Sequence, residues 1–181
     1  MRIIGGTLKG RVIYPVNLVA RPTTDFAKEG LFNILANEYD FATLHVLDLF
    51  GGSGSISFEF ASRGSPLVTC VEMNAAHASF IKKTAIQLNL NAIRVVRHNV
   101  FDFISICKQT YDLVFADPPF DLHHLEMLPK KIEKAQLLHS GGVFIIEHHA
   151  SFDFSRSTGY QRIKKYGNVH FTFFSFDQLQ K

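Results

Sequence analysis

The sequence predicts an α/β fold in which helices cover both faces of a mostly parallel sheet. Two patterns indicate this architecture: short, continuously apolar runs of strand length, and amphipathic helical spacing between them. Strands that are buried on both faces read as continuous apolar runs, and their alternation with helices is typical of a parallel sheet. The 181 residues suit one domain, and 46% hydrophobic residues, including 18 Phe, exclude a disordered chain.

The elements follow in order from the N-terminus. Residues 2–14 predict two short strands around Gly-rich turns, and a helix is expected to begin after Thr24 or Asp25 as N-cap. The positions that recur at helical spacing are Ala27, Leu31, Ile34, Leu35 and Glu38. Further strands are expected over 44–50, 67–72, 93–97, 111–116, 143–147 and 171–176. Helices are expected after Gly54, around Ile81 and from Leu128 to Leu138, the last of them closed by Gly141-Gly142.

Composition and charge narrow the class of protein. The formal net charge is +3, but residues 1–24 hold four basic residues and no acidic one. The basic residues are Arg2, Lys9, Arg11 and Arg21. This segment fits a polyanionic partner, although a solvated strand face explains four charges almost as well. No membrane span or secretory signal is visible, and Cys70 and Cys107 cannot form a disulfide framework, so we expect a cytoplasmic protein, monomeric by default for its size.

A glycine-rich turn follows the first long strand. Residues 48–54 (DLFGGSG) lack the Gly-Lys-Ser/Thr ending of a phosphate-binding loop, and Ile56 and Ser57 stand where a dinucleotide motif has its last glycine. The small residues let a ligand approach the backbone closely. Asp48 places a carboxylate at the strand end, which suits an ammonium group better than a phosphate. An ordinary tight turn remains the alternative interpretation.

Glu72 ends the next predicted strand, 18 residues beyond Gly54, where an acid can chelate both ribose hydroxyls. The predicted site therefore has one acid for an ammonium group, one acid for a ribose and no phosphate-binding loop. These features match the chemical groups of S-adenosylmethionine. Met73 is expected either to lie against the adenine or to fill a core gap. Asn99 and Val100 are expected to contact the adenine edge, unless Asn99 merely forms a turn.

The segment Asp117-Pro118-Pro119-Phe120 follows the fourth long strand and carries the strongest chemical signal. Two prolines remove two N–H donors and fix two φ angles, so the backbone is stiff. An exocyclic amine becomes nucleophilic only as its nitrogen pyramidalises. Asp117 and the Pro118 carbonyl are expected to accept its two hydrogens and stabilise the developing positive charge, while Phe120 stacks on the extruded base. A Pro-Pro turn with a chance acid is the alternative.

These motifs resemble those of amino-directed nucleic-acid methyltransferases, and N-terminal motifs narrow the resemblance to the RsmD family. The N-terminal motifs are Arg2–Gly6, Lys9–Arg11, Arg21–Asp25 and Leu31–Leu35. The resemblance implies transfer of a methyl group from S-adenosylmethionine to the N2 amine of a guanine in bacterial 16S ribosomal RNA. It also implies a Rossmann-like methyltransferase fold with a mostly parallel seven-stranded sheet, a basic β-hairpin extension over residues 1–24 and a catalytic domain over 25–181.

The resemblance assigns roles to particular residues. The catalytic residues would be Asp117, Pro118 and Phe120. The cofactor would be bound by Thr23, Asp48, Phe50, Gly52, Gly54, Glu72, Met73, Asn99 and Val100. The RNA, either naked or within a small-subunit particle, would contact Arg2, Lys9, Arg11 and Arg21. No metal is expected.

Two stretches depart from the family pattern. Residues 28–30 (KEG) stand where the family often has Arg-Glu and Thr, Ala or Ser, and a glycine inside a helix costs stability. Residues 121–124 (DLHH) replace basic or small residues after the catalytic motif. The pairs His123-His124 and His148-His149 are expected to be surface or loop histidines, because no Cys or acid stands at ligand spacing with either pair.

The sequence leaves alternatives open for the target base and for the class of function. Guanine presents N1–H beside its N2 amine, and an ionised Asp117 can accept from both, whereas the N1 acceptor of adenine suits an Asn better. An N6-adenine DNA methyltransferase is one rival, although 181 residues leave little room for a target-recognition region. An RNA-binding module with a relic cofactor pocket and a nicotinamide oxidoreductase are the others.

Overall fold

The computed structural model describes residues 1–15, 25–119, 122–123 and 125–176. Its centre is a seven-stranded sheet with the strand order β3-β2-β1-β4-β5-β7-β6. The strands are β1 (His45–Leu49), β2 (Leu67–Val71), β3 (Ile93–Val96), β4 (Tyr111–Ala116), β5 (Leu138–His149), β6 (Tyr160–Tyr166) and β7 (Val169–Phe174). Strands β3, β2, β1, β4 and β5 pair in parallel, and β7 lies antiparallel between β5 and β6. The predicted fold class is confirmed.

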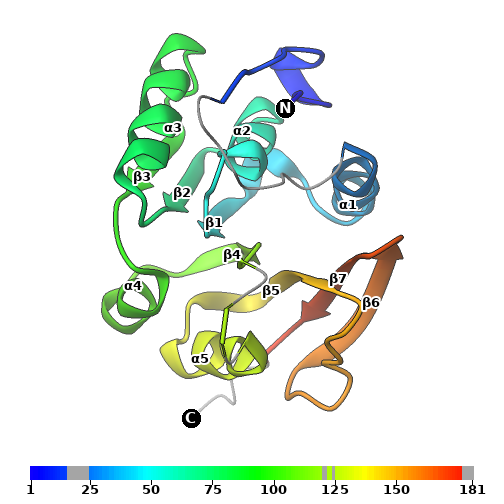
Figure 1. Cartoon of the computed structure of the whole chain (residues 1–181). Helices are drawn as coiled ribbons and strands as arrows, with labels where there is room; N and C mark the ends of the chain where they lie inside the picture. Colours follow the sequence, from blue (N-terminus) through cyan, green and yellow to red (C-terminus); the bar gives the residue numbers. More distant parts are fainter. Residues whose placement is uncertain (16–24, 120–121, 124, 177–181) are drawn as a thin grey trace.

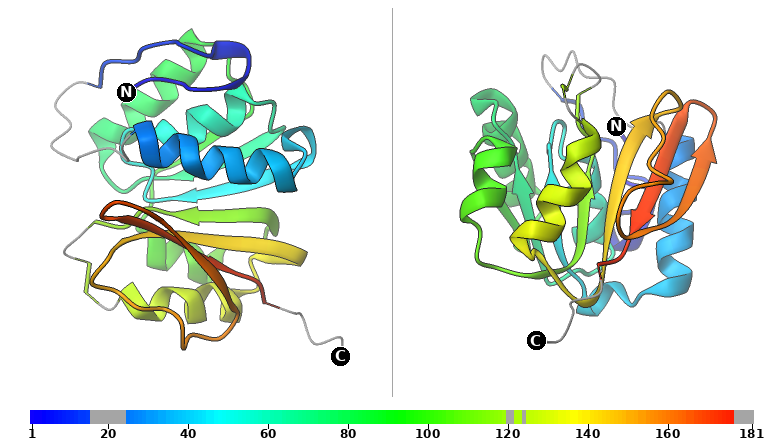
Figure 2. Two further views of the ribbon diagram at one scale, coloured as in Figure 1. Left: turned by 90° about the vertical axis from the view of Figure 1, so that its right-hand side faces the viewer. Right: turned by 90° about the horizontal axis from the view of Figure 1, so that it is seen from below.

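Helices cover both faces of this sheet (Figures 1 and 2). The α-helices are α1 (Asp25–Glu38), α2 (Ser55–Ser62), α3 (Ala75–Gln87), α4 (Val100–Ile106) and α5 (Leu128–Ala135), and the short 3-10 helices are Gly6–Leu8, Phe41–Thr43 and Leu125–Met127. Side chains of α1, α2 and α3 form one apolar core against the sheet, which we call the first core. Those of α4 and α5 form the second core on the opposite face. Two covered faces explain why the parallel strands are continuously apolar.

Successive residues of each strand alternate between the two cores. In β4, Leu113 and Phe115 belong to the first core, whereas Val114 and Ala116 belong to the second. This period of two follows from the pleat of a β-strand. The same alternation determines the face onto which a side chain projects just beyond a strand's carboxyl end, where ligands of open parallel sheets bind.

Residues 1–15 form a segment that we call the N-terminal arm. Its two limbs are joined by one antiparallel bridge between Arg2 and Val12, with a hydrogen bond of 2.9 Å from Ile3 N to Arg11 O. The prediction of two short strands here was wrong in detail, because the 3-10 helix Gly6–Leu8 occupies most of the connection. The arm nevertheless packs on the domain, since Ile3 is only 2% exposed and joins the first core.

The predicted end of the last helix was also wrong. Helix α5 ends at Ala135, because Gln136 adopts a left-handed conformation with φ 51°, and Leu138 already pairs with Tyr111 in the sheet. Strand β5 therefore runs through Gly141-Gly142, which do not close a helix. Helix α4 and strand β6 were not predicted at all, because both are short and lack a strong apolar period.

Candidate functional site

The glycine turn between β1 and α2 has three glycines with different tasks. A β-carbon on Gly51 would lie 2.4 Å from Cys70 Sγ, and one on Gly54 would lie 2.8 Å from the Phe58 ring, so both positions pack against protein. Gly52 has a left-handed φ of 53°, and among the described residues a β-carbon there would meet only Phe50 O, at 3.7 Å. Gly52 is therefore the position of the turn at which another molecule can approach the backbone.

Phe50 also has a left-handed backbone, with φ 65°. This conformation is uncommon for a bulky residue and is typical of functional turns. Its ring packs edge-to-face against Phe101 of α4, with centroids 6.4 Å apart. The strained residue is thus held by the second core at the start of the glycine turn.

Four carboxylates lie at or near the carboxyl ends of four neighbouring strands. We call these four residues the carboxylate row. They are Glu72 (β2), Asp48 (β1), Asp117 (β4) and Glu147 (β5). Each comes two residues after a residue of the first core, namely Cys70, Val46, Phe115 and Ile145 respectively. Because side chains alternate along extended chains, all four project toward the same face as α1, α2 and α3.

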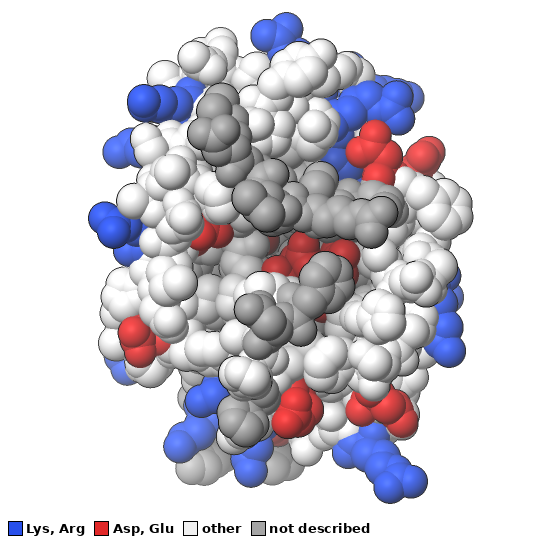
Figure 3. Space-filling model, in the orientation of Figure 1, with Lys and Arg blue, Asp and Glu red and all other residues white. Residues whose placement is uncertain are grey.

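The pairing register sets the depth of each carboxylate in the row. Ladder hydrogen bonds continue beyond β2 and β4, from Glu72 N to Val96 O at 3.0 Å and from Asp117 N to Leu49 O at 3.4 Å. Leu49 pairs with both Val71 and Ala116, and Ala116 pairs with Ile146, so Glu72, Asp117 and Glu147 lie level. Asp48 lies one pleat deeper. Acidic side chains are visible in the middle of this face, and most basic side chains lie toward its outer edge (Figure 3).

Glu72 is 9% exposed and is held by backbone donors. Its Oε2 accepts from Gly52 N and its Oε1 from Asn74 N, both at 2.7 Å. The first bond ties the carboxylate to the open position of the glycine turn. Each carboxylate oxygen keeps further acceptor capacity, so Glu72 is oriented to accept from two adjacent hydroxyls.

Asp48 lies beneath the turn and is 2% exposed. Ser57 Oγ donates to Asp48 Oδ2 at 2.5 Å. Burial, together with the charges of Asp117 and Glu72, raises the pKa of the Asp48 carboxyl to about 7, against the lowering effect of the Ser57 hydrogen bond. A carboxylate whose partner is a neutral hydroxyl, beside two other acids, favours a cation above it.

The segment with the two prolines begins where β4 ends, at Asp117. Asp117 is half-buried and Pro118 is buried. Pro119 O accepts from Leu122 N at 3.0 Å. Phe120 lies outside the described residues. The motif therefore holds Asp117 at the carboxyl end of β4, level with Glu72.

Of the residues expected near an adenine, Met73 lines a pocket, whereas the Asn99 side chain also has a structural role. Met73 is 63% exposed, so it does not fill a core gap. It lines a shallow pocket of about 330 Å³ with Arg97, His98 and Asn99. The Asn99 side chain caps α4, because its Oδ1 accepts from Phe101 N at 2.8 Å, and its Nδ2 lies 3.8 Å from Met73 Sδ. Asn99 therefore has only its amide N–H groups left for a ligand.

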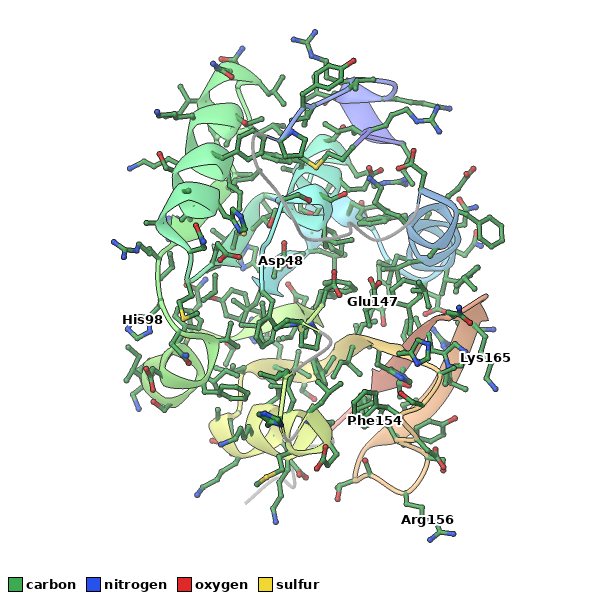
Figure 4. The ribbon with its side chains drawn as sticks, in the orientation of Figure 1. Asp48, His98, Glu147, Phe154, Arg156 and Lys165 are labelled. Carbon is green, nitrogen blue, oxygen red and sulfur yellow. The ribbon has the colours of Figure 1, made fainter. Side chains whose placement is uncertain are left out.

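Val100 is the first residue of α4, and its side chain is 4% exposed in the second core. Any contact of Val100 with a ligand would consequently run through its backbone. Thr23, which was also predicted to bind the cofactor, and Thr24 lie outside the described residues. Figure 4 shows Asp48 and Glu147 in the middle of the face and His98 at its edge.

The N-terminal arm fixes its backbone and exposes its basic side chains. Ile4 N donates to Glu59 Oε2 at 2.8 Å, and Lys9 and Arg11 are exposed. Arg2 Nε lies 3.5 Å from Asp25 Oδ2, so this predicted RNA contact is shared with an acid of α1. Arg21 lies outside the described residues.

The structure explains the unusual residues 28–30. Lys28 is 1% exposed and its Nζ donates to Arg2 O at 2.6 Å and to Ser55 Oγ at 3.0 Å, which joins the arm to α1 and α2. A β-carbon on Gly30 would lie 2.1 Å from the Tyr166 ring of β6. The glycine therefore lets the β6–β7 hairpin pack onto α1, a compensation that the sequence did not reveal.

Of the two histidine pairs, His123 and His149 are exposed as predicted, His124 lies outside the described residues, and His148 departs from the prediction. His148 is 5% exposed, contrary to the expected surface or loop position, and lies 2.7 Å from Thr172 Oγ1 through Nε2. Within the described residues, no group of three or more His, Cys, Asp or Glu side chains could hold a metal ion. No helix among the described residues is long and apolar enough to cross a membrane.

Sequence reasoning missed Glu147. Its signal was available, because it ends a predicted apolar strand just as Glu72 and Asp117 do. What the sequence alone did not show is that β5 lies directly beside β4, which makes Glu147 the fourth member of the row.

Comparison with known proteins agrees with this geometry. The family model described as conserved hypothetical protein 95 matches residues 1–175. Ribosomal RNA small subunit methyltransferase D from Buchnera aphidicola subsp. Baizongia pistaciae is 33% identical over 148 residues, which cover 81% of this chain and 75% of that protein. The Escherichia coli K12 protein of the same name is 37% identical over 121 residues, covering 66% of this chain and 60% of that protein.

A solved structure agrees along the whole chain. The Escherichia coli protein yhhF superposes with a TM-score of 0.84 at 30% identity, covering 98% of each chain. The family match over residues 1–175 includes the arm, the glycine turn and the segment that begins at Asp117. The chain therefore belongs to the RsmD family.

Proposed function

We propose that this protein transfers a methyl group from S-adenosylmethionine to the exocyclic N2 amine of a guanine in 16S ribosomal RNA. The observation that carries the proposal is the carboxylate row, in which Asp117 and its two prolines lie level with Glu72 beside the glycine turn. The family membership and the names of the curated relatives support the RNA substrate. Naked ribosomal RNA or a small-subunit particle is the proposed partner, in the cytoplasm.

The residues present fit this cofactor. Gly52 offers backbone without a side chain on its open side, and Glu72 keeps acceptor capacity for two ribose hydroxyls. S-adenosylmethionine supplies a methyl group on a positively charged sulfonium. We assign Asp48 a Coulombic role, because it is buried beneath the turn and its negative charge favours a cationic ligand above it. Met73 and the Asn99 amide N–H groups are proposed to contact the adenine.

Asp117 has the catalytic role in this proposal. The reaction forms an N–C bond, breaks an S–C bond and releases one proton from the amine. As positive charge develops on the amine nitrogen, an acceptor held at the end of a rigid strand stabilises it without reorganising. We propose that Asp117 and the Pro118 carbonyl accept the two amine hydrogens. Because alignment provides most of the rate in such displacements, the stiff Pro-Pro backbone contributes by position.

The arm is proposed to bind the RNA backbone. Lys9 and Arg11 are exposed on a segment whose backbone is anchored to α2, so they can meet phosphates without disturbing the core. The basic side chains toward the outer edge of this face, away from the central acidic ones, fit the same division (Figure 3). Phosphates would bind around the site while a neutral base enters it.

The experiment that tests the proposal uses labelled S-adenosylmethionine and ribosomal RNA from cells that lack the enzyme. Transfer is measured on naked RNA and on small-subunit particles, and the product nucleosides are then analysed. N2-methylguanosine is the expected product. N6-methyladenosine would instead support an adenine methyltransferase, and absence of S-adenosylmethionine binding by calorimetry would support a relic pocket.

A further inference from the structure

The carboxylate row contains one acid that the proposed reaction has not yet used. Glu147 ends the parallel part of β5, and Ile146 pairs with Ala116, so Glu147 lies level with Asp117 on the adjacent strand. Ile145 and Phe115, two residues earlier in each strand, belong to the same first core. Glu147 and Asp117 therefore project side by side onto the same face.

The backbone of Glu147 is held on both sides. Strand β5 pairs with β4 on one side and with β7 on the other, where Glu147 is in register with Phe171. The next residue, His148, is buried and bonded to Thr172 of β7. A carboxylate on such a strand is fixed in position, unlike one on a loop, and it is half-buried at the site, where it can meet a ligand.

The spacing of the two acids matches two neighbouring donors on one base edge. Adjacent strands lie about 4.8 Å apart, so their level side chains can reach neighbouring groups of one ligand. Guanine presents its N2 amine beside N1–H, both donors, and an ionised carboxylate only accepts. Adenine and 2-aminopurine present an unprotonated N1, which a carboxylate does not bind.

We propose that Glu147 accepts the N1–H of the target guanine while Asp117 accepts the N2 amine, which makes Glu147 a specificity-determining residue of the site. This inference rests on the proposed guanine-N2 methylation. It divides between two acids the recognition that sequence reasoning gave to Asp117 alone. It also accounts for a second carboxylate at a position that amine activation by itself does not require.

The test compares two RNA substrates that differ at the modified nucleotide, once nucleoside analysis and mapping have located it. One carries guanine, and the other carries 2-aminopurine, which keeps the amine but has no N1–H. The wild-type protein is expected to prefer guanine in kcat/KM. Glu147→Gln is expected to lower kcat/KM for guanine by about 10–100-fold, the usual loss of a hydrogen bond to a charged group. The same substitution should also lower the ratio of kcat/KM for guanine to kcat/KM for 2-aminopurine at least about tenfold, because the Gln amide can donate to an unprotonated N1.

Two further variants separate specificity from structure. Glu147→Ala also removes the acceptor and should likewise narrow the preference, so the test does not depend on one variant folding. Glu29→Gln, a matched loss of one carboxylate on the exposed side of α1, should change neither kcat/KM nor preference. S-adenosylmethionine affinity should be the same in all of these proteins.

The outcomes distinguish the two proposals. If the wild-type protein makes N2-methylguanosine and the Glu147 variants keep the full preference for guanine over 2-aminopurine, the role of Glu147 is refuted while the proposed function stands. If the wild-type product is N6-methyladenosine, the proposed function fails, and the assignment of Glu147 fails with it.

Discussion

The N-terminal arm and the carboxylate row both depend on buried acids, but the two regions compensate them differently. Glu59 of α2 is 0% exposed, and it accepts from Arg63 Nε and from Ile4 N, each at 2.8 Å. Lys28 lies nearby and is bonded to two oxygens of its own protein. Asp48 of β1 is equally buried, yet its hydrogen-bond partner is the neutral Ser57 hydroxyl.

The difference teaches how a fold marks a site. Where a buried charge serves structure, the chain supplies the opposite charge itself. Where Asp48 lies, burial and then the neighbouring acids Asp117 and Glu72 raise its pKa, so a cationic ligand completes the electrostatics. The arm should therefore respond to mutation in stability, and the carboxylate row in binding and rate.

The largest expected effect tests the structural region. Glu59→Gln removes the charge opposite Arg63, and breaking one partner of a buried pair should cost about 3–5 kcal/mol of unfolding free energy. Urea denaturation measures it, with the exposed Glu29→Gln as a control expected to stay within about 0.5 kcal/mol of wild type. A change in Glu59→Gln as small as that of the control would contradict the structural role.

The next effect tests the functional region. Asp117→Ala should reduce single-turnover methyl transfer by roughly 10²–10³-fold, the scale of losing one preorganised stabilising group. Its melting temperature and S-adenosylmethionine affinity should stay near wild type. Asp117→Asn should also be impaired, because one acceptor oxygen becomes a donor aimed at a donor of guanine. Wild-type transfer by Asp117→Ala would remove Asp117 from the mechanism, and an Asn variant faster than wild type would indicate adenine.

A smaller effect concerns the cofactor end of the row. Glu72→Ala should weaken S-adenosylmethionine binding by about 1.5–3 kcal/mol, because hydrogen bonds to a carboxylate are lost. Calorimetry at constant pH measures this affinity. Since Glu72 also accepts from Gly52 N, Glu72→Gln serves as a second variant that can keep the turn in place. Unchanged affinity in both variants would remove Glu72 from the cofactor site.

Asp48 links binding to pH. Its folded-state pKa is raised from 3.8 to about 7, so the folded protein keeps a proton that the unfolded chain loses as the pH rises above about 4. Asp48 therefore contributes less stability as the pH rises from 4 to 7, and its ionised form destabilises the protein above pH 7. The stability of Asp48→Asn relative to wild type should therefore rise by about 2–3 kcal/mol between pH 5 and pH 8, because each pH unit between 5 and 7 adds about 1.4 kcal/mol to the cost of keeping the Asp48 proton in the folded state.

The same substitution should weaken S-adenosylmethionine binding more at pH 8 than at pH 6, because only the ionised Asp48 attracts a cation. Chemical denaturation and calorimetry at the two pH values measure both effects. An Asn variant whose stability parallels that of wild type across this range would show that Asp48 does not titrate there.

The smallest expected effect concerns the exposed side chains of the arm. Replacing Lys9 and Arg11 with Ala should weaken RNA binding and lower its logarithmic salt slope by about 0.7–0.9 for each phosphate that the variant no longer neutralises. Binding titrations at several salt concentrations measure the slope. S-adenosylmethionine affinity is the internal control. Unaltered RNA affinity and salt slope would mean that these side chains belong to a solvated surface.

Much of the fold was predictable because its signals are local. Continuous apolar runs and helical spacing located six of the strands and most helices, and strand ends pointed to Glu72 and Asp117. Strand β6 was missed because its sequence lacks a strong apolar period, although its partner β7 follows directly in the chain. The end of α5 was missed for a different reason, because Leu138 leaves the helical pattern to pair with Tyr111, which is distant in sequence. The capping role of Asn99 matched its turn-forming alternative.

The sequence by itself determined which residue types stand at the ends of buried strands, because the periods of two and 3.6 are properties of adjacent residues. Only the tertiary structure decided which of those ends become neighbours. Strand order placed β5 beside β4. The pairing register placed Glu72, Asp117 and Glu147 at one level and Asp48 one pleat below them. Depth in turn determined the burial that raises the pKa of Asp48, because desolvation depends on everything packed around a group and not on its place in the chain.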